Sequence, residues 1–271
     1  MADAAAARVA PRERDVIDTA PAFTQADADR LNARFAGVDV RVMLAELFAE
    51  GSLGRVAVVS SFGTESAVLL HLVATADPTV PVVFVDTLKM FPETLAYRDT
   101  LTSQFGLVNS SVVQPDLAVL AAKDENGLRW SWDPDGCCEI RKVEPLARAK
   151  RGLDAWISGR KAFQSVTREN LPRFEIEDGR LKINPLGDWT KDHLEAYFAE
   201  HDLPRHPLEA QGYLSVGCAP CTSVVKPGED PRAGRWRGWD KTECGIHTPV
   251  STPVGMPDQG DELPPGYDPV F

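Results

Sequence analysis

The stretch Arg55–Ala76, RVAVVSSFGTESAVLLHLVATA, decides the fold class of this chain. It begins with Arg55–Ser60, a short apolar run rich in β-branched side chains, which predicts a buried strand. A turn-like segment, Ser61–Thr64, follows, and Ser66–Ala76 then has the length and apolar content of a helix. The order strand, loop, helix is the repeating unit of a parallel α/β sheet.

The same order recurs along the chain. We expect further strands over Pro81–Asp86, Val108–Val113 and Ala155–Ser158, and further helices over Asp27–Phe35, Val42–Ala49, Pro92–Phe105, Cys137–Lys150 and Trp189–His201. Near-continuous apolar strands that alternate with helices indicate an α/β fold, a parallel sheet with helices on both faces. The polar segment Arg173–Asn184 resembles a hairpin, and we expect it and the helix that Thr190 opens to decorate the main core.

Length and composition divide the chain into three parts. Its 271 residues are close to the upper size for one hydrophobic core, so one large domain is expected. We predict an irregular Ala-rich lead-in over 1–25, the α/β domain over 26–225 and a flexible tail over 226–271. The tail is assigned on its many Pro and Gly residues and its lack of periodicity.

Charge and cysteine content exclude several classes of partner and predict the cellular location of the protein. The 29 Lys and Arg residues face 40 Asp and Glu residues, and the net charge of −11 argues against nucleic-acid or anionic-membrane partners. No apolar run reaches the roughly 20 residues that cross a bilayer, and no secretory signal opens the chain, so a cytoplasmic location is predicted. The odd count of five Cys makes a disulfide framework improbable there. A homo-oligomer is compatible with this sequence.

The loop Ser60–Ser66 is the first candidate site. It joins the end of a predicted parallel strand to the start of a helix, where backbone amides and the helix dipole favour an anion. Gly63 permits close backbone approach, and the hydroxyls of Ser60, Ser61 and Thr64 add donors for a phosphate. A capped turn without function has the same pattern, and the loop matches neither the dinucleotide nor the Walker fingerprint.

The cysteines form the second candidate site. Cys137 and Cys138 are adjacent, and Cys218 and Cys221 form a Cys-x-x-Cys motif beside Gly217. Two separated thiolate pairs supply the four ligands that zinc or an iron–sulfur cluster takes, and ligand softness does not separate the two metals. The alternative is two buried pairs of inert thiols.

The third candidate is the fifth cysteine, Cys244, with His247 three positions on. Basic residues precede it at Arg232, Arg235, Arg237 and Lys241. Cations lower the pKa of a nearby thiol, so Cys244 could be a nucleophile on a mobile segment, although an incidental surface thiol fits as well. Further cations that could hold a phosphate or sulfate, or else lie on solvated helix faces, are Arg141, Lys142, Arg160, Lys161 and Arg168.

Taken together, these residues resemble one family, the assimilatory sulfonucleotide reductases, and specifically the iron–sulfur-containing adenosine 5′-phosphosulfate (APS) reductases of the bacterial type. The resemblance runs from about residue 40 to residue 247. It rests on Ser60–Ser66, Val85–Thr87, Phe91–Thr94, Cys137–Leu146, Trp156–Gly159, Asn184–Leu186, Cys218–Cys221, Arg232–Trp236 and Glu243–His247, in the family's order.

The resemblance implies a Rossmann-like fold of the adenine-nucleotide α-hydrolase type. It also implies a [4Fe-4S] cluster on Cys137, Cys138, Cys218 and Cys221, and a catalytic pair in which Cys244 is the nucleophile and His247 lies near it. By the same resemblance, the phosphosulfate and nucleotide would be held by Ser60, Ser61, the backbone of Gly63 and Thr64, Lys142, Gly159, Arg168, Arg232 and Arg235.

The family's chemistry implies a reaction in two stages. The Cys244 thiolate attacks the sulfur of APS, AMP departs, and the enzyme holds a Cys S-sulfonate. With the other cysteines engaged as ligands, an external dithiol protein such as thioredoxin must release sulfite. The tail must then open after closing over the substrate, and the product feeds sulfate assimilation and cysteine biosynthesis.

Three alternatives stay open. The loop Ser60–Thr64 also resembles that of the cluster-free relatives that use 3′-phosphoadenosine 5′-phosphosulfate (PAPS), although the cysteine pairs usually accompany APS use. A pyrophosphate-loop ligase or thiolase that uses ATP, with a structural Cys₄ metal site, is a second alternative. The third is a zinc-stabilised nucleotide-binding module without catalysis.

Overall fold

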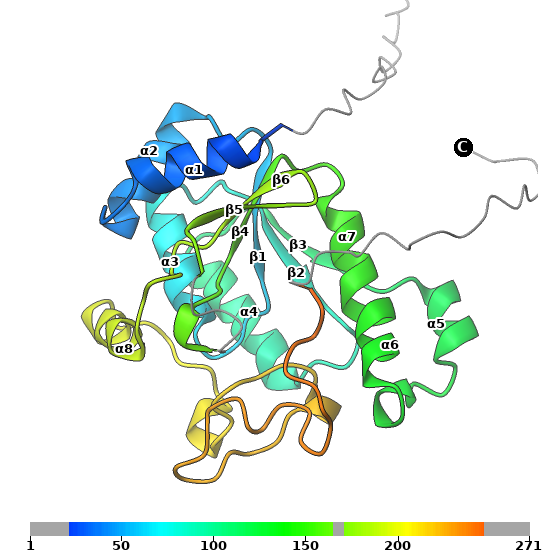
Figure 1. Ribbon diagram of the computed structural model, residues 1–271. Helices are drawn as coiled ribbons and strands as arrows, with labels where there is room; N and C mark the ends of the chain where they lie inside the picture. The colour runs from blue at the N-terminus through cyan, green and yellow to red at the C-terminus, as the bar shows by residue number, and fades with distance from the viewer. Residues whose placement is uncertain (1–21, 165–170, 247–271) are drawn as a thin grey trace, which may run out of the picture.

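A computed structural model describes residues 22–164 and 171–246, which build a six-stranded sheet flanked by helices (Figure 1). The strands are β1 (Val56–Ser60), β2 (Val82–Val85), β3 (Ser110–Val113), β4 (Ala155–Ser158), β5 (Phe174–Glu177) and β6 (Arg180–Ile183). Their order in the sheet is β3-β2-β1-β4-β6-β5, and every pairing is parallel except that of β5 with β6. The expected α/β class is therefore confirmed.

Helices cover both faces of the sheet. They are α1 (Gln25–Arg34), α2 (Val40–Glu50), α3 (Ser66–Ala76), α4 (Pro92–Gln104), α5 (Leu117–Lys123), α6 (Pro134–Cys138), α7 (Glu144–Lys150) and α8 (Lys191–Glu200). In Figure 1, α2 and α3 lie on one side of the sheet and α6 and α7 on the other. Buried side chains of α2 and α3, among them Met43, Leu44 and Leu70, pack with Val58 and Phe84 of the sheet.

The strand order fixes where a ligand can bind. The chain proceeds outward from β1 to β2 and β3, then returns to place β4 on the other side of β1. In open α/β sheets, the crevice outside the carboxyl ends of strands at such a reversal is the usual ligand site. Ser60 ends β1 and Ser158 ends β4, so the residues that follow these strands meet at that crevice.

The hairpin prediction was right about the two strands but wrong about their place. β6 pairs in parallel with β4, so the hairpin extends the main sheet and does not merely decorate it. Leu181 and Ile183 are fully buried there, and the charged residue between them, Lys182, hides this in the sequence. At the outer edge, the side-chain amide of Asn32 in α1 donates to the carbonyl of Phe174 and accepts from its N–H, which covers β5.

The single helix predicted over Cys137–Lys150 is three segments in the structure. α6 ends at Cys138, a π-helical turn spans Glu139–Val143, and α7 follows. π turns inside helices are frequent at functional sites because they re-aim the side chains around them. By contrast, the predicted helix Ser66–Ala76, the strand Ala155–Ser158 and the Thr190 cap are each found as expected.

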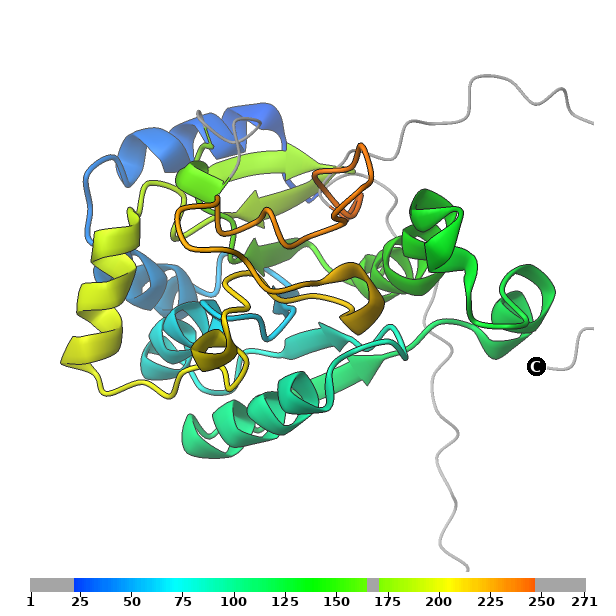
Figure 2. The same ribbon diagram turned by 90° about the horizontal axis from the view of Figure 1, so that it is seen from below.

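After α8 the chain crosses below the carboxyl ends of the strands, as the yellow and orange segments of Figures 1 and 2 show. Short 3-10 turns at Glu209–Gln211 and Ala219–Cys221 interrupt this stretch. The predicted tail over 226–271 is described to Ile246, and there Trp236 is buried and donates its N–H to the carbonyl of Cys221. No helix of the described part is long and apolar enough to cross a membrane.

Candidate active site

A cavity of about 200 Å³ lies at the crevice between the carboxyl ends of β1 and β4. Its lining comes from the ends of β1 and β4 with the segments that follow them, from the π-helical turn and from the last part of the described chain. Besides apolar side chains, the lining residues are Ser60, Ser61, Gly63, Thr64, Glu65, Ser66, Lys142, Ser158, Gly159, Arg160, Lys161, Ser215, Gly217, Arg232, Arg235, Glu243 and Cys244. The structure thus gathers all the predicted substrate-binding residues that it describes around one hollow.

The loop after β1 is held in a strained shape. Phe62 has a φ of +49°, in the left-handed region, yet its side chain is fully buried and meets the ring of Phe84 edge-on with centroids 5.4 Å apart. Its N–H donates to the hydroxyl of Ser60 at 3.1 Å. Core packing therefore supports the strain and turns the chain so that Gly63 and the first residue of α3, Ser66, line the cavity.

The segment after β4 supplies two cations beside Gly159. Arg160 pairs with Glu175 at 2.9 Å, and Lys161, which is buried, pairs with Glu65 at 2.8 Å. The sequence analysis left open whether these two cations hold a phosphate or sulfate or lie on solvated helix faces. Both line the cavity, which favours the first role. Gly159 itself leaves room for close approach, since a Cβ there would meet Leu69 only at an ordinary 3.7 Å.

Lys142 and Arg235 stand between this cavity and a second one. Both side chains line both cavities, together with Trp236, over whose ring the Arg235 guanidinium lies at 4.4 Å from the centroid. Burial acts against the charge of Lys142, but the nearby Cys218 and Cys244 thiol groups raise the pKa of this lysine above its usual value. Lys142 is therefore a firmly charged cation at the wall of the substrate cavity.

Arg141, the neighbour of Lys142, has a structural role. Its guanidinium is buried, pairs with Asp124 at 2.6 Å and donates to the carbonyl of Thr87 at 2.9 Å. It therefore ties the π turn to the end of β2 and lies outside the substrate cavity. Of the two adjacent cations in the sequence, the structure selects Lys142 as the one that faces the ligand site.

The four predicted ligand cysteines line the second cavity. Cys137 and Cys138 close α6, whose start Asp133 caps by accepting from the N–H of Gly136 at 2.8 Å. Cys218 comes from the opposite side, with its Sγ 3.2 Å from the hydroxyl of Thr87. The backbone N–H of the next residue, Ala219, donates to the carbonyl of Lys89, so these cysteine segments meet beyond the end of β2.

The chemistry of this donor set fits a thiolate-bound metal centre. Burial raises the pKa of Cys137, Cys138 and Cys221 to about 11, while Lys142 and Thr87 outweigh burial and lower that of Cys218. Such thiols lose their protons to a metal ion or cluster. Within 22–164 and 171–246, no three His, Cys, Asp or Glu side chains are arranged as a formed metal site. The fit therefore rests on four thiols around one cavity with cations beside them.

Cys244 lines the substrate cavity on a segment that folds back over it. Arg232 donates to the carbonyl of Thr242 at 2.7 Å and pairs with Glu243 at 3.3 Å, which fixes the approach of this segment. Gly245 follows with a φ of +82°, in the left-handed region that favours glycine. The backbone thus needs glycine directly after the predicted nucleophile.

Two predicted site residues, Arg168 and His247, lie outside the described residues. Other polar residues of the cavity wall were not singled out as site residues by the sequence analysis. Glu65, Ser158 and Glu243 lie inside motifs that carry the resemblance, whereas Ser215 lies in none of them, and all four are brought together only when the strand ends meet the last segment.

Comparison with known proteins shows the family to which this fold is similar. Residues 55–224 match the family model described as the phosphoadenosine phosphosulfate reductase domain. An adenosine 5′-phosphosulfate reductase of Mesorhizobium japonicum is 48% identical over 88% of this chain and 93% of its own. One of Chelativorans sp. is 53% identical over 72% of this chain and 80% of its own.

Among solved structures, phosphoadenylyl-sulfate (PAPS) reductase from Candida auris, in a phosphate complex, has the same fold. It superposes with a TM-score of 0.63 at 26% identity, over 75% of this chain and 98% of that one. The Rossmann-like architecture expected from the sequence is therefore confirmed.

Proposed function

This chain belongs to the phosphoadenosine phosphosulfate reductase domain family, and from that premise we propose that it reduces APS to sulfite and AMP in sulfate assimilation. The choice of APS over PAPS is supported by the two relatives of high identity, both of which are adenosine 5′-phosphosulfate reductases. The protein is an enzyme that acts on a sulfur group.

One observation carries the proposal. Cys244 lines the same cavity as the Ser60–Ser66 loop and a ring of cations. A phosphosulfate needs amide, hydroxyl and cationic partners, and reduction of its sulfur needs a nucleophile in reach of that sulfur. A thiol and an anion-binding loop lie together at the crevice where the strand order reverses, and this arrangement fits both demands.

In the first stage, the Cys244 thiolate attacks the sulfur of APS. A bond forms between Sγ and that sulfur, and the bond from sulfur to the bridging phosphate oxygen breaks, its electron pair leaving with AMP. Lys142, Arg232 and Arg235 line the cavity where this negative charge develops and would stabilise it. His247 is proposed near the thiol, and Arg168 and Gly159 among the groups that hold the nucleotide.

In the second stage, an external dithiol protein of the thioredoxin kind completes the reaction. Its thiolate attacks Sγ of the Cys244 S-sulfonate, sulfite leaves with the bonding pair, and a mixed disulfide forms. Its second thiol then frees Cys244 and leaves the partner as a disulfide, which accounts for both electrons. The segment around Cys244, which now lines the cavity, moves away from it in this step so that the partner's thiolate can reach Sγ.

We propose further that Cys137, Cys138, Cys218 and Cys221 hold a [4Fe-4S] cluster. When bound, it would cross-link the α6 and Cys218–Cys221 segments and place an electron-rich centre beside the substrate site. Lys142 and Arg235 line both cavities and so would face the cluster on one side and the phosphosulfate on the other. The position of the two cations is therefore coupled to the integrity of the thiol site.

The cluster assignment is tested by paired substitutions. Cys138→Ser removes one proposed ligand, and the purified protein is expected to lose its brown colour together with most of its iron and acid-labile sulfide. Cys244→Ser serves as the matched control, because this thiol lies in the substrate cavity, and it is expected to keep the visible absorption. A colourless Cys244→Ser protein, or a fully coloured Cys138→Ser protein, would contradict the assignment.

The activity is tested with parallel substrates. Sulfite release is measured with APS and with PAPS in the presence of thioredoxin, thioredoxin reductase and NADPH, and AMP release is measured with ATP alone. APS is expected to give the largest kcat/KM. Preference for PAPS would establish the nearest alternative, and AMP release from ATP without any sulfonucleotide would favour the ligase or thiolase alternative.

A further inference from the structure

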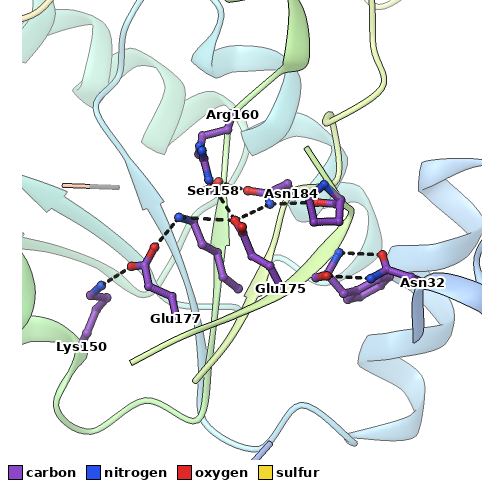
Figure 3. Close-up of polar contacts among 10 residues, drawn as sticks. Asn32, Lys150, Ser158, Arg160, Glu175, Glu177 and Asn184 are labelled. Atoms are coloured by element: carbon purple, nitrogen blue, oxygen red, sulfur yellow. Dashed lines mark hydrogen bonds and ion pairs between the residues drawn. The ribbon is translucent and has the colours of Figure 1, made fainter. Parts of the chain in front are cut away.

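A series of ion pairs runs from the end of α7 across β5 and β6 to the substrate cavity, and its last member is Arg160 (Figure 3). Lys150 at the end of α7 pairs with Glu177 at 2.9 Å, and Glu177 in turn pairs with Lys182 of β6. Lys182 lies 3.5 Å from Glu175, and Glu175 pairs with Arg160. Of this series, only Arg160 has been named above as a candidate for holding a phosphate or sulfate, and the other four residues have no assigned role.

Because most of these charges are buried, removal of any one of them is expected to lower the free energy of unfolding. The side chains of Lys150, Glu177 and Lys182 are at most 8% exposed. Buried charges persist only when they are paired and hydrogen-bonded, and removal of one partner leaves another uncompensated. Three cations alternate with two carboxylates here, so the series carries a net charge of +1, and its end at the cavity is the guanidinium of Arg160.

Glu175 also supports a second residue of the cavity wall. Its Oε1 accepts from the side-chain amide of Asn184 at 2.9 Å, and the Oδ1 of Asn184 accepts from the hydroxyl of Ser158 at 2.6 Å. Ser158 and Arg160 flank Gly159 at the end of β4, and all three line the cavity. One carboxylate on an outer strand therefore orients both neighbours of Gly159 (Figure 3).

Arg160 has donors left for a ligand. Its side chain is 12% exposed, and Nη1 is used by Glu175. Its Nε–H is buried and has no hydrogen-bond partner among the described residues. An unpaired buried donor on a cation is costly unless a ligand satisfies it. The orphaned group thus points to an anion as the missing partner.

We propose that Arg160 binds an anionic oxygen of the nucleotide and that Glu175 is the positioning residue that holds Arg160 and, through Asn184, Ser158 in place for it. This inference rests on the proposed function, because it takes the ligand of the cavity to be an adenine nucleotide with a phosphate. Glu175 does not touch the ligand and acts only through the residues that do.

The test compares Glu175→Gln with Glu177→Gln. Both remove one carboxylate charge from the same strand and the same series of ion pairs, but Glu177 has no contact with Arg160 or Asn184. Binding of AMP is measured by titration calorimetry, KM and kcat for APS by sulfite release, and thermal unfolding by circular dichroism.

Glu175→Gln is expected to weaken AMP binding and to raise the KM for APS by about tenfold each, with kcat within about twofold of the parent. Glu177→Gln is expected to lower the unfolding midpoint, because buried Lys150 loses its carboxylate partner and Lys182 keeps only Glu175 at 3.5 Å, while AMP binding and KM stay at the parent values. In the Arg160→Gln background, Glu175→Gln should add a smaller effect than in the parent, since Arg160 is gone and only the route through Asn184 to Ser158 remains.

Parent-like AMP binding by Glu175→Gln would overturn the proposal, and so would equal losses in Glu175→Gln and Glu177→Gln or additive losses in the double variant. The proposed function fails separately. If the parent protein binds AMP but releases no sulfite from APS, the reductase assignment is wrong, while the AMP titrations still decide the role of Glu175.

Discussion

At the scale of single residues, the placement of Arg235 depends on a residue with no side chain. The Arg235 guanidinium packs against Gly217, so closely that a Cβ on Gly217 would collide with it. Gly217 stands directly before the first cysteine of the Cys-x-x-Cys motif. Gly217 and Arg235 both line the substrate cavity. Glycine at this position therefore serves substrate binding as much as the cysteine loop.

Gly217→Ala is expected to displace Arg235 and to raise the KM for APS by about tenfold, the loss of roughly one charge-assisted contact. The side chain that must yield is flexible, so the unfolding midpoint should change little. Steady-state sulfite assays and thermal melts check both expectations. Gly152→Ala is the control, since a Cβ there meets nothing within 4 Å. An unchanged KM in Gly217→Ala would show that Arg235 does not hold the substrate.

At the scale of elements, His206 fastens the long segment after α8 to α4. Its ring is buried, accepts at Nδ1 from the N–H of Leu208 at 3.2 Å and meets the hydroxyl of Thr94 at Nε2, 3.0 Å away. The bond from Leu208 requires an unprotonated Nδ1. Burial lowers the pKa of His206 to about 4, although Glu93 acts in the opposite direction.

The stability that the His206 contacts contribute is therefore expected to depend on pH. Between pH 6.5 and 4 the unfolded chain binds a proton at His206 that the folded chain does not, so the free energy of unfolding falls as the pH falls. We expect His206→Gln to reduce the loss between pH 7 and 5 by about 2 kcal/mol relative to the parent. Urea unfolding at the two pH values measures this, and equal losses in parent and variant would refute it.

Local pattern was enough to predict the elements that build the crevice, because β1, α3 and β4 each bury apolar residues in a continuous run. It was not enough to place β6 beside β4, since that pairing joins residues 26 positions apart through a strand in which cationic and apolar residues alternate. Nor could it separate Arg141 from Lys142. Their difference depends on Asp124, a partner that only the fold brings close.

At the scale of the whole molecule, an acidic protein binds an anion. The net charge is −11, yet the substrate cavity is lined by Lys142, Arg160, Lys161, Arg232 and Arg235. Charges beyond about 10 Å are largely screened at physiological salt, so the local cations outweigh the distant carboxylates. The overall charge excludes a broad polyanion surface without excluding one small anionic substrate.

The distribution of cysteines sets the limits of the catalytic cycle. Four of the five thiols line the second cavity and only Cys244 lines the first. Without an external dithiol, the protein is therefore expected to release one AMP per chain from excess APS and then stop. Anaerobic rapid-quench chromatography counts the AMP. Continued release without reductant would mean that another thiol of the chain resolves the adduct.

The most direct test of the central claim is peptide mass spectrometry after anaerobic incubation with APS and no reductant. The account predicts a sulfonate on Cys244 alone, removed by reduced thioredoxin with release of an equal amount of sulfite, and absent in Cys244→Ser. An unmodified Cys244 with both APS and PAPS, in protein that retains its iron, would contradict the assignment of this cavity as a sulfonucleotide reductase site.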